Sequence, residues 1–147
     1  MFEPLVIRAH RHDYTVHFDR RFEDVLATDL RAGDFLIVDD NVASLYPVLG
    51  TAAQLVVKSQ EEAKRFDKLI PIIDALLQHR VTKSCRLVAI GGGVIQDITA
   101  FVAAVLFRGM DWIFVPTNLL TQCDSCIGSK SSINFGVYKN LLGCFHP

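Results

Sequence analysis

The feature that most constrains the fold lies between residues 86 and 107, where a strand pattern meets three glycines and then a helix pattern. Residues 86–90 form a short apolar run that predicts a β-strand. Gly91, Gly92 and Gly93 break that run. Residues 94–107 are apolar on nearly every side, which indicates a helix buried between other elements. A strand, a tight glycine turn and a buried helix in immediate succession are typical of α/β folds.

The rest of the chain alternates in the same way. Further strands are predicted at residues 35–39, 55–57 and 112–115, and helices at 22–30, 41–49, 61–79 and 119–127. Residues 5–9 and 14–18 predict a hairpin around a polar break at 10–13, and the chain after Gly128 is polar and loop-like. The order predicts one Rossmann-like α/β domain, an open and mostly parallel sheet with helices on both faces.

Bulk composition excludes several classes of protein. The 147 residues fit one domain, and 50% hydrophobic with 21% charged residues indicates a packed globule. A net charge of −1 predicts neither nucleic acid nor an anionic membrane as a partner. The most apolar stretch, residues 98–107, is far shorter than the roughly 20 residues that cross a bilayer. Because the N-terminus also lacks a signal-peptide pattern, we expect a cytoplasmic protein.

The four cysteines leave two interpretations open. Cys123 and Cys126 form a CxxC, and with Cys144 and His146 nearby they suggest a zinc or redox site. No second CxxC follows, and the spacing fits no common zinc module. We favour reduced cysteines that pack as small apolar residues.

Polar residues follow three of the predicted strands, at Asp39 to Asn41, at Gly91 to Gly93 and at Pro116 to Asn118. Ligands of open α/β sheets bind beyond the carboxyl ends of the strands. Glycines let the backbone approach a phosphate, and the helix N-terminus supplies free N–H groups. As a dinucleotide fingerprint the turn is imperfect, because Gln96 stands where a glycine is expected, so a plain tight turn stays open.

Two further groups of residues suggest anion chemistry. Asp97 lies in the first turn of the predicted helix, where it either offsets the helix dipole or faces a cofactor. Arg108, eleven residues on, would share its face at roughly 16 Å, either capping the helix or reaching an anion. The segment after Asp124 holds Lys130, Lys139 and Asn140 among glycines, which suits phosphate and hydroxyl binding but also an ordinary solvated loop.

Taken in order, these motifs resemble the central signature of 3-dehydroquinate synthases, within the sugar phosphate cyclase superfamily. The resemblance covers roughly residues 35–147. The matching strings are Asp39-x-Asn41-Val, Glu61-x-x-Lys64, Gly91-Gly-Gly-Val-Ile-x-Asp97, Arg108-Gly109, Val115-Pro-Thr-x-Leu-Leu120, Asp124-Ser, Gly128-x-Lys130, Asn134 and Lys139-Asn-Leu-x-Gly143.

The resemblance implies the N-terminal NAD-binding domain of a lyase. In the family, NAD transiently oxidises a hydroxyl of a heptulosonate 7-phosphate, phosphate is eliminated, and the ring closes to 3-dehydroquinate on the shikimate route to aromatic amino acids. A helical C-terminal domain carries the zinc (or cobalt) ligands, and no histidine of this chain matches them. We therefore expect no metal site in this chain and no activity from it alone.

The resemblance also implies roles for individual residues. It places a sugar phosphate substrate against the catalytic residues Asp124, Lys130, Lys139, Asn140 and Arg108. It places NAD against Asp39, Asn41, Glu61, Lys64, Gly91, Gly92, Gly93, Asp97, Thr117, Asn118, Lys130 and Lys139. Arg108 would reach the substrate phosphate of a neighbouring subunit, which implies a homodimer.

Three positions depart from the family pattern. Asn118 replaces a second threonine, and Gln96 and Ser129 each replace a glycine. A sister cyclase that makes a valiolone, gadusol or aminocyclitol precursor therefore stays an alternative. A metal-dependent polyol dehydrogenase is less suitable, because a simple alcohol needs no lysine cradle. A non-catalytic nucleotide-binding module is the remaining possibility.

Overall fold

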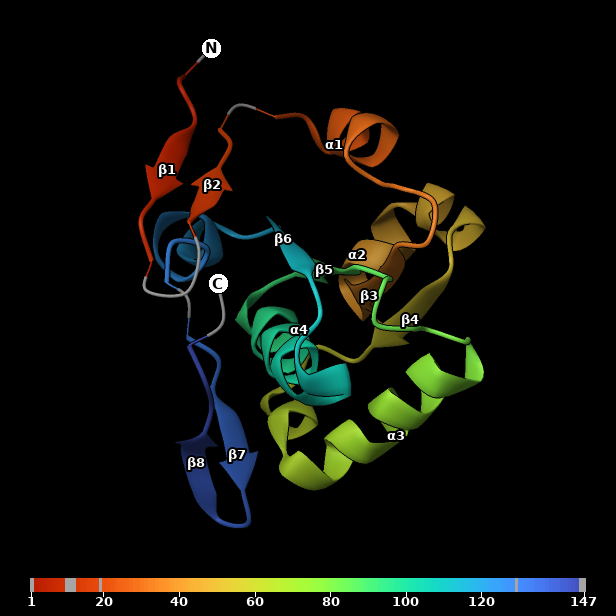
Figure 1. Ribbon diagram of the computed structural model, residues 1–147, viewed down its shortest axis with the longest axis vertical. Helices are drawn as coiled ribbons and strands as arrows, with labels where there is room; N and C mark the ends of the chain where they lie inside the picture. The colour runs from red at the N-terminus through yellow and green to blue at the C-terminus, as the bar shows by residue number, and fades with distance from the viewer. Residues whose placement is uncertain (1, 10–12, 19, 129, 146–147) are drawn as a thin grey trace.

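The computed structural model describes residues 2–9, 13–18, 20–128 and 130–145, and its centre is a parallel sheet of four strands. The strands are β3 (Phe35–Asp39), β4 (Gln54–Val57), β5 (Leu87–Gly91) and β6 (Trp112–Pro116), in the spatial order β4-β3-β5-β6 (Figure 1). Every residue of β3 and β5 is buried, as expected for strands covered on both faces. The predicted Rossmann-like α/β fold is confirmed.

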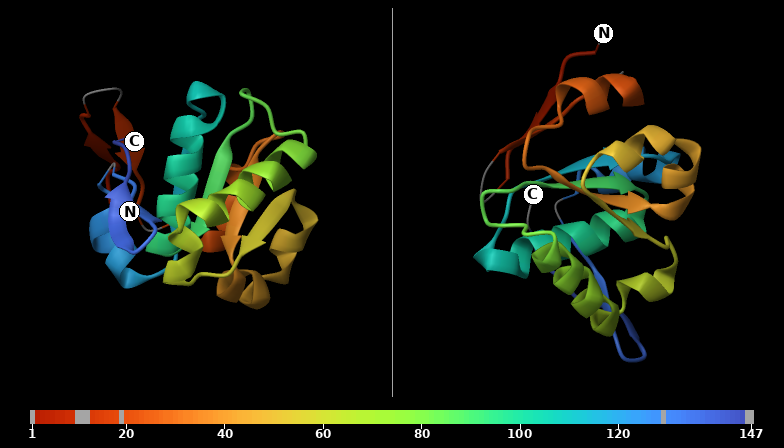
Figure 2. Two further views of the ribbon diagram at one scale, coloured as in Figure 1. Left: turned by 90° about the horizontal axis from the view of Figure 1, so that it is seen from below. Right: turned by 90° about the vertical axis from the view of Figure 1, so that its right-hand side faces the viewer.

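Helices cover both faces of this sheet. On one face lie α1 (Phe22–Thr28), α2 (Asp40–Leu45) and the 3₁₀ turn η1 (Pro47–Thr51), and on the other lie α3 (Phe66–Gln78) and α4 (Gly93–Val105), as the right panel of Figure 2 shows. Alternate residues of each strand feed the two layers: Leu36 and Val38 pack toward the first, and Phe35 and Ile37 toward the second. The second layer holds the larger core.

Two predicted helices are broken where the backbone must be extended. The helix predicted at 61–79 divides into the 3₁₀ turn η2 (Glu61–Lys64) and α3, because Arg65 is extended and forms a β-bridge with Asn134. The helix predicted at 41–49 ends at Leu45, because Pro47 disfavours the helical conformation in the residue before it. Both breaks move the ends of helices without changing the layers.

The helix that follows the glycines is shorter than predicted. It ends at Val105, and the turn η3 (Leu106–Arg108) follows with left-handed φ values of 51° at Phe107 and 63° at Arg108. The helical phase is lost at these residues. The prediction that Arg108 shares a helix face with Asp97 is therefore wrong.

The N-terminal hairpin is confirmed, with β1 (Leu5–Ile7) antiparallel to β2 (Tyr14–Val16), although residues 10–12 of its predicted turn lie outside the described residues. The Tyr14 hydroxyl donates a hydrogen bond to the carbonyl of Ile127, after the π-helical turn η4 (Thr121–Ser125). Burial raises the pKa of Tyr14, with a smaller contribution from Cys126, so the phenol stays a donor at neutral pH.

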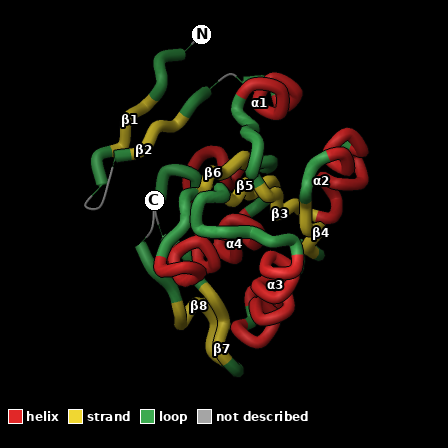
Figure 3. The backbone as a smooth tube through the Cα atoms, turned by 45° about the vertical axis from the view of Figure 1, so that its right-hand side comes forward, coloured by secondary structure: helices red, strands yellow, loops and turns green. Residues whose placement is uncertain are grey.

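The predicted loop after Gly128 is wrong, because the segment forms a second hairpin. Strands β7 (Ile133–Phe135) and β8 (Tyr138–Leu142) are antiparallel, and Gly136 takes the left-handed φ of 59° that their turn requires. Figure 3 shows this hairpin beside the start of α3, where the rings of Phe66 and Phe135 are 6.0 Å apart. Within the described ranges, none of the helices is long and apolar enough to span a membrane.

Candidate functional site

Three strand ends meet along one edge of the sheet. β3 ends at Asp39, β5 at Gly91 and β6 at Pro116. Because the chain leaves β3 toward β4 on one side and returns to β5 on the other, the strand order reverses between β3 and β5. Crevices at such reversals are where open α/β sheets bind ligands.

The three glycines have different structural roles. A Cβ on Gly91 would lie 2.7 Å from Cγ1 of Ile95 and 2.9 Å from Cβ of Asp39, so only glycine lets α4 pack this closely on β3 and β5. A Cβ on Gly93 would meet nothing nearer than Cγ2 of Thr121 at 3.9 Å, an ordinary van der Waals contact, so this position has room for a methyl group. Among the described residues no side chain caps the helix at Gly92, and its first N–H groups are available to an anion.

Asn118 lies over this turn. Its Nδ2 would be 2.6 Å from a Cβ on Gly92, and its Oδ1 accepts hydrogen bonds of 3.0 Å from the backbone N–H and the hydroxyl of Thr121. Thr117, exposed beside it, donates its backbone N–H to the carbonyl of Gly91. The residues after β6 therefore hold an amide group next to the free helix N-terminus.

Asp39 caps the helix that follows β3. Its Oδ1 accepts from the backbone N–H of Asn41 at 2.8 Å and from Nδ2 of Asn41 at 3.2 Å. The Asp39 side chain is buried and Asn41 is exposed. The cap fixes both residues at the carboxyl end of β3, where a helix-capping carboxylate stabilises α2 whether or not a ligand is present.

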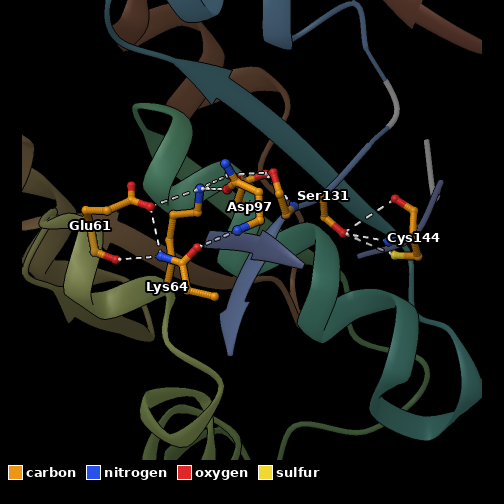
Figure 4. Close-up of polar contacts among 8 residues, drawn as sticks. Glu61, Lys64, Asp97, Ser131 and Cys144 are labelled. Carbon is orange, nitrogen blue, oxygen red and sulfur yellow. Dashed lines mark hydrogen bonds and ion pairs between the residues drawn. The ribbon is translucent and has the colours of Figure 1, made fainter. Parts of the chain in front are cut away.

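Lys64 is the centre of a buried polar network that joins three parts of the chain (Figure 4). Its Nζ lies 2.8 Å from Oδ2 of Asp97 on α4, 3.0 Å from Oδ1 of Asn140 on β8 and 3.7 Å from Oε1 of Glu61. The lysine is only 6% exposed. Asp97 also accepts the backbone N–H of Ser132 at 2.9 Å, so both of its oxygens are bonded. The sequence prediction named these residues but did not foresee that Lys64 pairs with Asp97.

Asn134 attaches the second hairpin to this network through two hydrogen bonds, which we call the latch. Its Nδ2 donates to Oε1 of Glu61 at 2.8 Å, and its Oδ1 accepts the backbone N–H of Asn140 at 2.7 Å. Asn140 holds a left-handed φ of 53°, a conformation that asparagine tolerates better than most residues. A nearby second latch joins Ser131, before β7, to Cys144 through a backbone hydrogen bond of 2.9 Å (Figure 4). The prediction assigned Asn134 no role, although its place within the motif was a signal.

A cavity of about 180 Å³ opens beside the network. It brings together Gly93, Asp97, Asp124 and Lys130, which the sequence prediction named, and four residues that it did not assign to the site. The full lining is Gly93, Gln96, Asp97, Asp124, Ser125, Gly128, Lys130 and Ser132. One ammonium group, two carboxylates and two hydroxyls suit a small polyol that carries an anionic group.

Comparison with known proteins supports this chemistry. Residues 54–147 match the family model for the 3-dehydroquinate synthase N-terminal region. The chain belongs to the 3-dehydroquinate synthase family. It is 40% identical over 120 residues to 3-dehydroquinate synthase of Rhizobium meliloti (strain 1021), covering 76% of this chain and 32% of the relative. It is 42% identical over 134 residues to that of Alkaliphilus oremlandii (strain OhILAs), covering 84% and 37%. The chain thus spans about a third of the length of these relatives.

Solved structures of sugar phosphate cyclases have the same fold. ValA, the 2-epi-5-epi-valiolone synthase of Streptomyces hygroscopicus subsp. jinggangensis 5008, with NAD+ and Zn2+ bound, is 30% identical with a TM-score of 0.72 over 83% of this chain and 37% of that one. 2-Deoxy-scyllo-inosose synthase, complexed with carbaglucose-6-phosphate, NAD+ and Co2+, has a TM-score of 0.82 over 99% and 44%. At 24% identity the second likeness concerns the fold alone.

Three of the five residues with an implied catalytic role, Arg108, Lys139 and Asn140, do not line the cavity. Arg108 is exposed beyond the far end of α4, and the 13 residues of that helix correspond to about 20 Å along its axis. Lys139 is exposed on β8, next to Asn140 of the polar network.

The described residues do not form a metal site. Across the described ranges, no three His, Cys, Asp or Glu side chains gather as they must to hold an ion. The candidate zinc cysteines Cys123 and Cys126 are free thiols, as is Cys144, and His146 lies outside the described residues. Burial raises the pKa of Cys126, so its thiol is protonated at neutral pH in the metal-free chain. No step of the chemistry is therefore assigned to a metal held by this chain.

Proposed function

We propose that the chain is the NAD-binding domain of a 3-dehydroquinate synthase, which converts a heptulosonate 7-phosphate to 3-dehydroquinate with elimination of phosphate. The observation that carries the proposal is the uncapped N-terminus of α4, with room beside Gly93, next to a cavity that holds Lys130 and two carboxylates. The first feature suits the pyrophosphate of a dinucleotide. The second suits a sugar phosphate. The family membership supports combining them in one enzyme.

Each part of the site has a role in this proposal. The N–H groups at Gly93 hold the pyrophosphate, and the amide of Asn118 donates to it from above. NAD held by these groups would supply reversible hydride transfer with a ring carbon of the substrate. Asp124 accepts hydrogen bonds from substrate hydroxyls, and Lys130 neutralises an anionic group. The Lys64–Asp97 pair keeps a carboxylate at the cavity wall without leaving its charge unpaired.

The same geometry supports a second candidate, a sister sugar phosphate cyclase. The observation in its favour is the 30% identity to ValA over 83% of the chain. The two candidates share the cofactor and the reaction class and differ in the sugar phosphate. Turnover of a heptulosonate 7-phosphate by the full-length protein, compared with sedoheptulose 7-phosphate, separates them.

Replacing Gly93 with alanine tests the cofactor site. The added methyl group meets no atom nearer than 3.9 Å and lies at the first position of a helix. The free energy of unfolding is therefore expected to stay the same or to rise by about 0.5–1 kcal/mol. The methyl group stands where the pyrophosphate would pass. We expect NAD affinity, measured by calorimetry, to fall by roughly tenfold or more, since a misplaced phosphate loses its charge-assisted bonds to the N–H groups.

The control for this experiment is Gly50→Ala, which adds the same methyl group 3.8 Å from Nε2 of Gln54 and away from the strand ends. It should leave NAD affinity unchanged. Equal NAD affinity in the Gly93→Ala protein and the unaltered chain would mean that the pyrophosphate does not bind at this turn. The main support for the proposal would then be lost.

The position of Arg108 supports a homodimer. The residue lies about one helix length from the cavity of its own chain, so it can bind a substrate phosphate only in the site of another copy. Its exposed guanidinium is suited to a bidentate contact with phosphate. The dimer is part of the proposal and depends on the same enzyme assignment.

An apolar surface on the second hairpin is proposed to bind the remaining domain of the enzyme. Val137 is 90% exposed, Tyr138 63% and Leu141 58%, with Leu119 and Leu120 also exposed. Exposed apolar patches mark interaction surfaces. Because the match covers only 32% and 37% of these relatives, their remaining domain is the occupant that we assign to it.

The isolated 147-residue chain is therefore expected to self-associate at high concentration, since this surface has no cover. Sedimentation velocity should show oligomers that Val137→Lys reduces. The matched control is Val48→Lys, which changes another exposed valine, on η1, and should have no such effect. A chain that stays monomeric at high concentration would argue against a docking role for the hairpin.

A further inference from the structure

Gln96 is a buried polar residue that lowers the stability of the fold through one of its two polar atoms. It lies in α4 and is 3% exposed. Its Nε2 donates a hydrogen bond of 2.7 Å to the carbonyl of Ser125, whereas its Oε1 is buried and has no partner among the described residues. An unpartnered buried carbonyl destabilises a protein, and an apolar side chain of equal length would avoid that cost. The contribution of this side chain is therefore the hydrogen bond from its Nε2 to the Ser125 carbonyl.

Nε2 of Gln96 holds a segment that has few other attachments. The segment from Thr121 to Gly128 begins as a short π-helical turn, and its residues Gln122, Cys123, Asp124 and Gly128 are exposed. The Tyr14 hydroxyl binds the segment at Ile127, from the hairpin that Figure 1 shows beside η4. Gln96 and Tyr14 thus bind two carbonyls of this segment that lie two residues apart, one from a buried helix and the other from a separate hairpin.

The residues of this turn form one wall of the cavity. Asp124 precedes the carbonyl that Gln96 holds, and Lys130 follows the turn; both line the cavity together with Gln96. We infer that Gln96 is a positioning residue, which sets where Asp124 and Lys130 stand relative to a bound sugar phosphate. This inference rests on the proposed function. A shift of the turn by a fraction of an ångström would weaken the polyol contacts while leaving the sheet and the NAD turn intact.

The test replaces Gln96 with methionine, which keeps the length of the side chain and removes both the donor and the unpartnered acceptor. We expect the unfolding temperature to change little, because the gain from removing the unpartnered Oε1 offsets the loss of the hydrogen bond to the Ser125 carbonyl. With saturating NAD, the affinity for the heptulosonate 7-phosphate of the proposed reaction, which the isolated chain is not expected to turn over, should fall roughly tenfold in calorimetry, the effect of a small misplacement of binding groups. The affinity for NAD should stay within about twofold, since the glycine turn is untouched.

A second readout needs no ligand. Cys126 is half-buried in the same turn, and its thiol donates to the carbonyl of Gln122 at 3.1 Å. Loosening the turn exposes this thiol, so its alkylation by iodoacetamide, followed by mass spectrometry of the Cys126 peptide, should be several-fold faster in Gln96→Met. Thr99→Val is the matched control: Thr99 is also buried in α4, its hydroxyl has no partner in the described part of the chain, and it does not line the cavity. It should change neither readout.

Each outcome decides the inference. A lower unfolding temperature with NAD and sugar phosphate affinities reduced alike would make Gln96 a packing residue and overturn the inference. Unchanged Cys126 alkylation would also overturn it, because the turn would then hold its position without Gln96. If the unaltered chain binds no NAD, the proposed function fails, and the alkylation rates together with the unfolding temperature still decide whether Gln96 holds the turn.

Discussion

Replacing Lys64 with methionine is expected to destabilise the chain by about 3–5 kcal/mol, the usual result of removing one partner of a buried ion pair. The lysine side chain is 8% exposed and that of Asp97 16%, so solvent screens the pair only weakly. Methionine leaves the Asp97 carboxylate without its cation and the Asn140 carbonyl without its donor. Urea unfolding followed by circular dichroism measures the change in free energy.

The matched control is Lys68→Met, which removes an exposed lysine near the start of α3 and should change stability by less than about 0.5 kcal/mol. A second substitution, Asp97→Asn, removes the uncompensated charge and should recover part of the loss in the double variant. If Lys64→Met costs no more than Lys68→Met, the pair is not the structural centre of the site.

Gly91→Ala is the other substitution with a large expected effect. Its Cβ would lie 2.7 Å from Ile95 and 2.9 Å from Asp39, and these neighbours sit in the packed layers around the end of β5. Overpacking of this kind costs about 1–3 kcal/mol, because the strand and α4 must move apart. At the upper end, the melting temperature should fall by about 6–12 °C, given roughly 2–4 °C per kcal/mol for chains of this size.

Differential scanning calorimetry of the Gly91→Ala and Gly93→Ala proteins gives the sharpest contrast. The two substitutions lie two residues apart in one turn, yet only the first creates a clash. We expect the melting temperature to fall for Gly91→Ala and to hold or rise for Gly93→Ala. Equal melting temperatures would mean that α4 moves away from β3 at little cost.

The sheet and its layers were predictable because a strand buried on both faces is a continuous apolar run, which can be recognised in the local sequence. The residues of β3 and β5 are continuously apolar, and each run ends at a polar or glycine residue that the strand ends require. Helical spacing identified α3, and the apolar character of α4 indicated its buried position. The turn at Gly91 was predictable for the same reason, since strand, glycines and helix are adjacent in the chain.

The second hairpin was missed because hydrogen bonds among polar side chains hold it, and such bonds leave no periodic mark. Ser131 and Asn134 are buried, but each is satisfied by a partner from a distant or folded-back segment. The pairing of Lys64 with Asp97 was missed for a related reason. Sequence spacing describes neighbours on one helix, whereas this pair joins a 3₁₀ turn to another helix.

The latch between the second hairpin and η2 is expected to form late in folding. Asn140 is 76 residues from Lys64 in the chain, and Asn134 is 73 residues from Glu61. Such long loops are entropically expensive to close and slow the rate at which their contacts form. During refolding, the parallel sheet should gain hydrogen-exchange protection before the latch, so that the region richest in reactive side chains is the last to become rigid and the first to open.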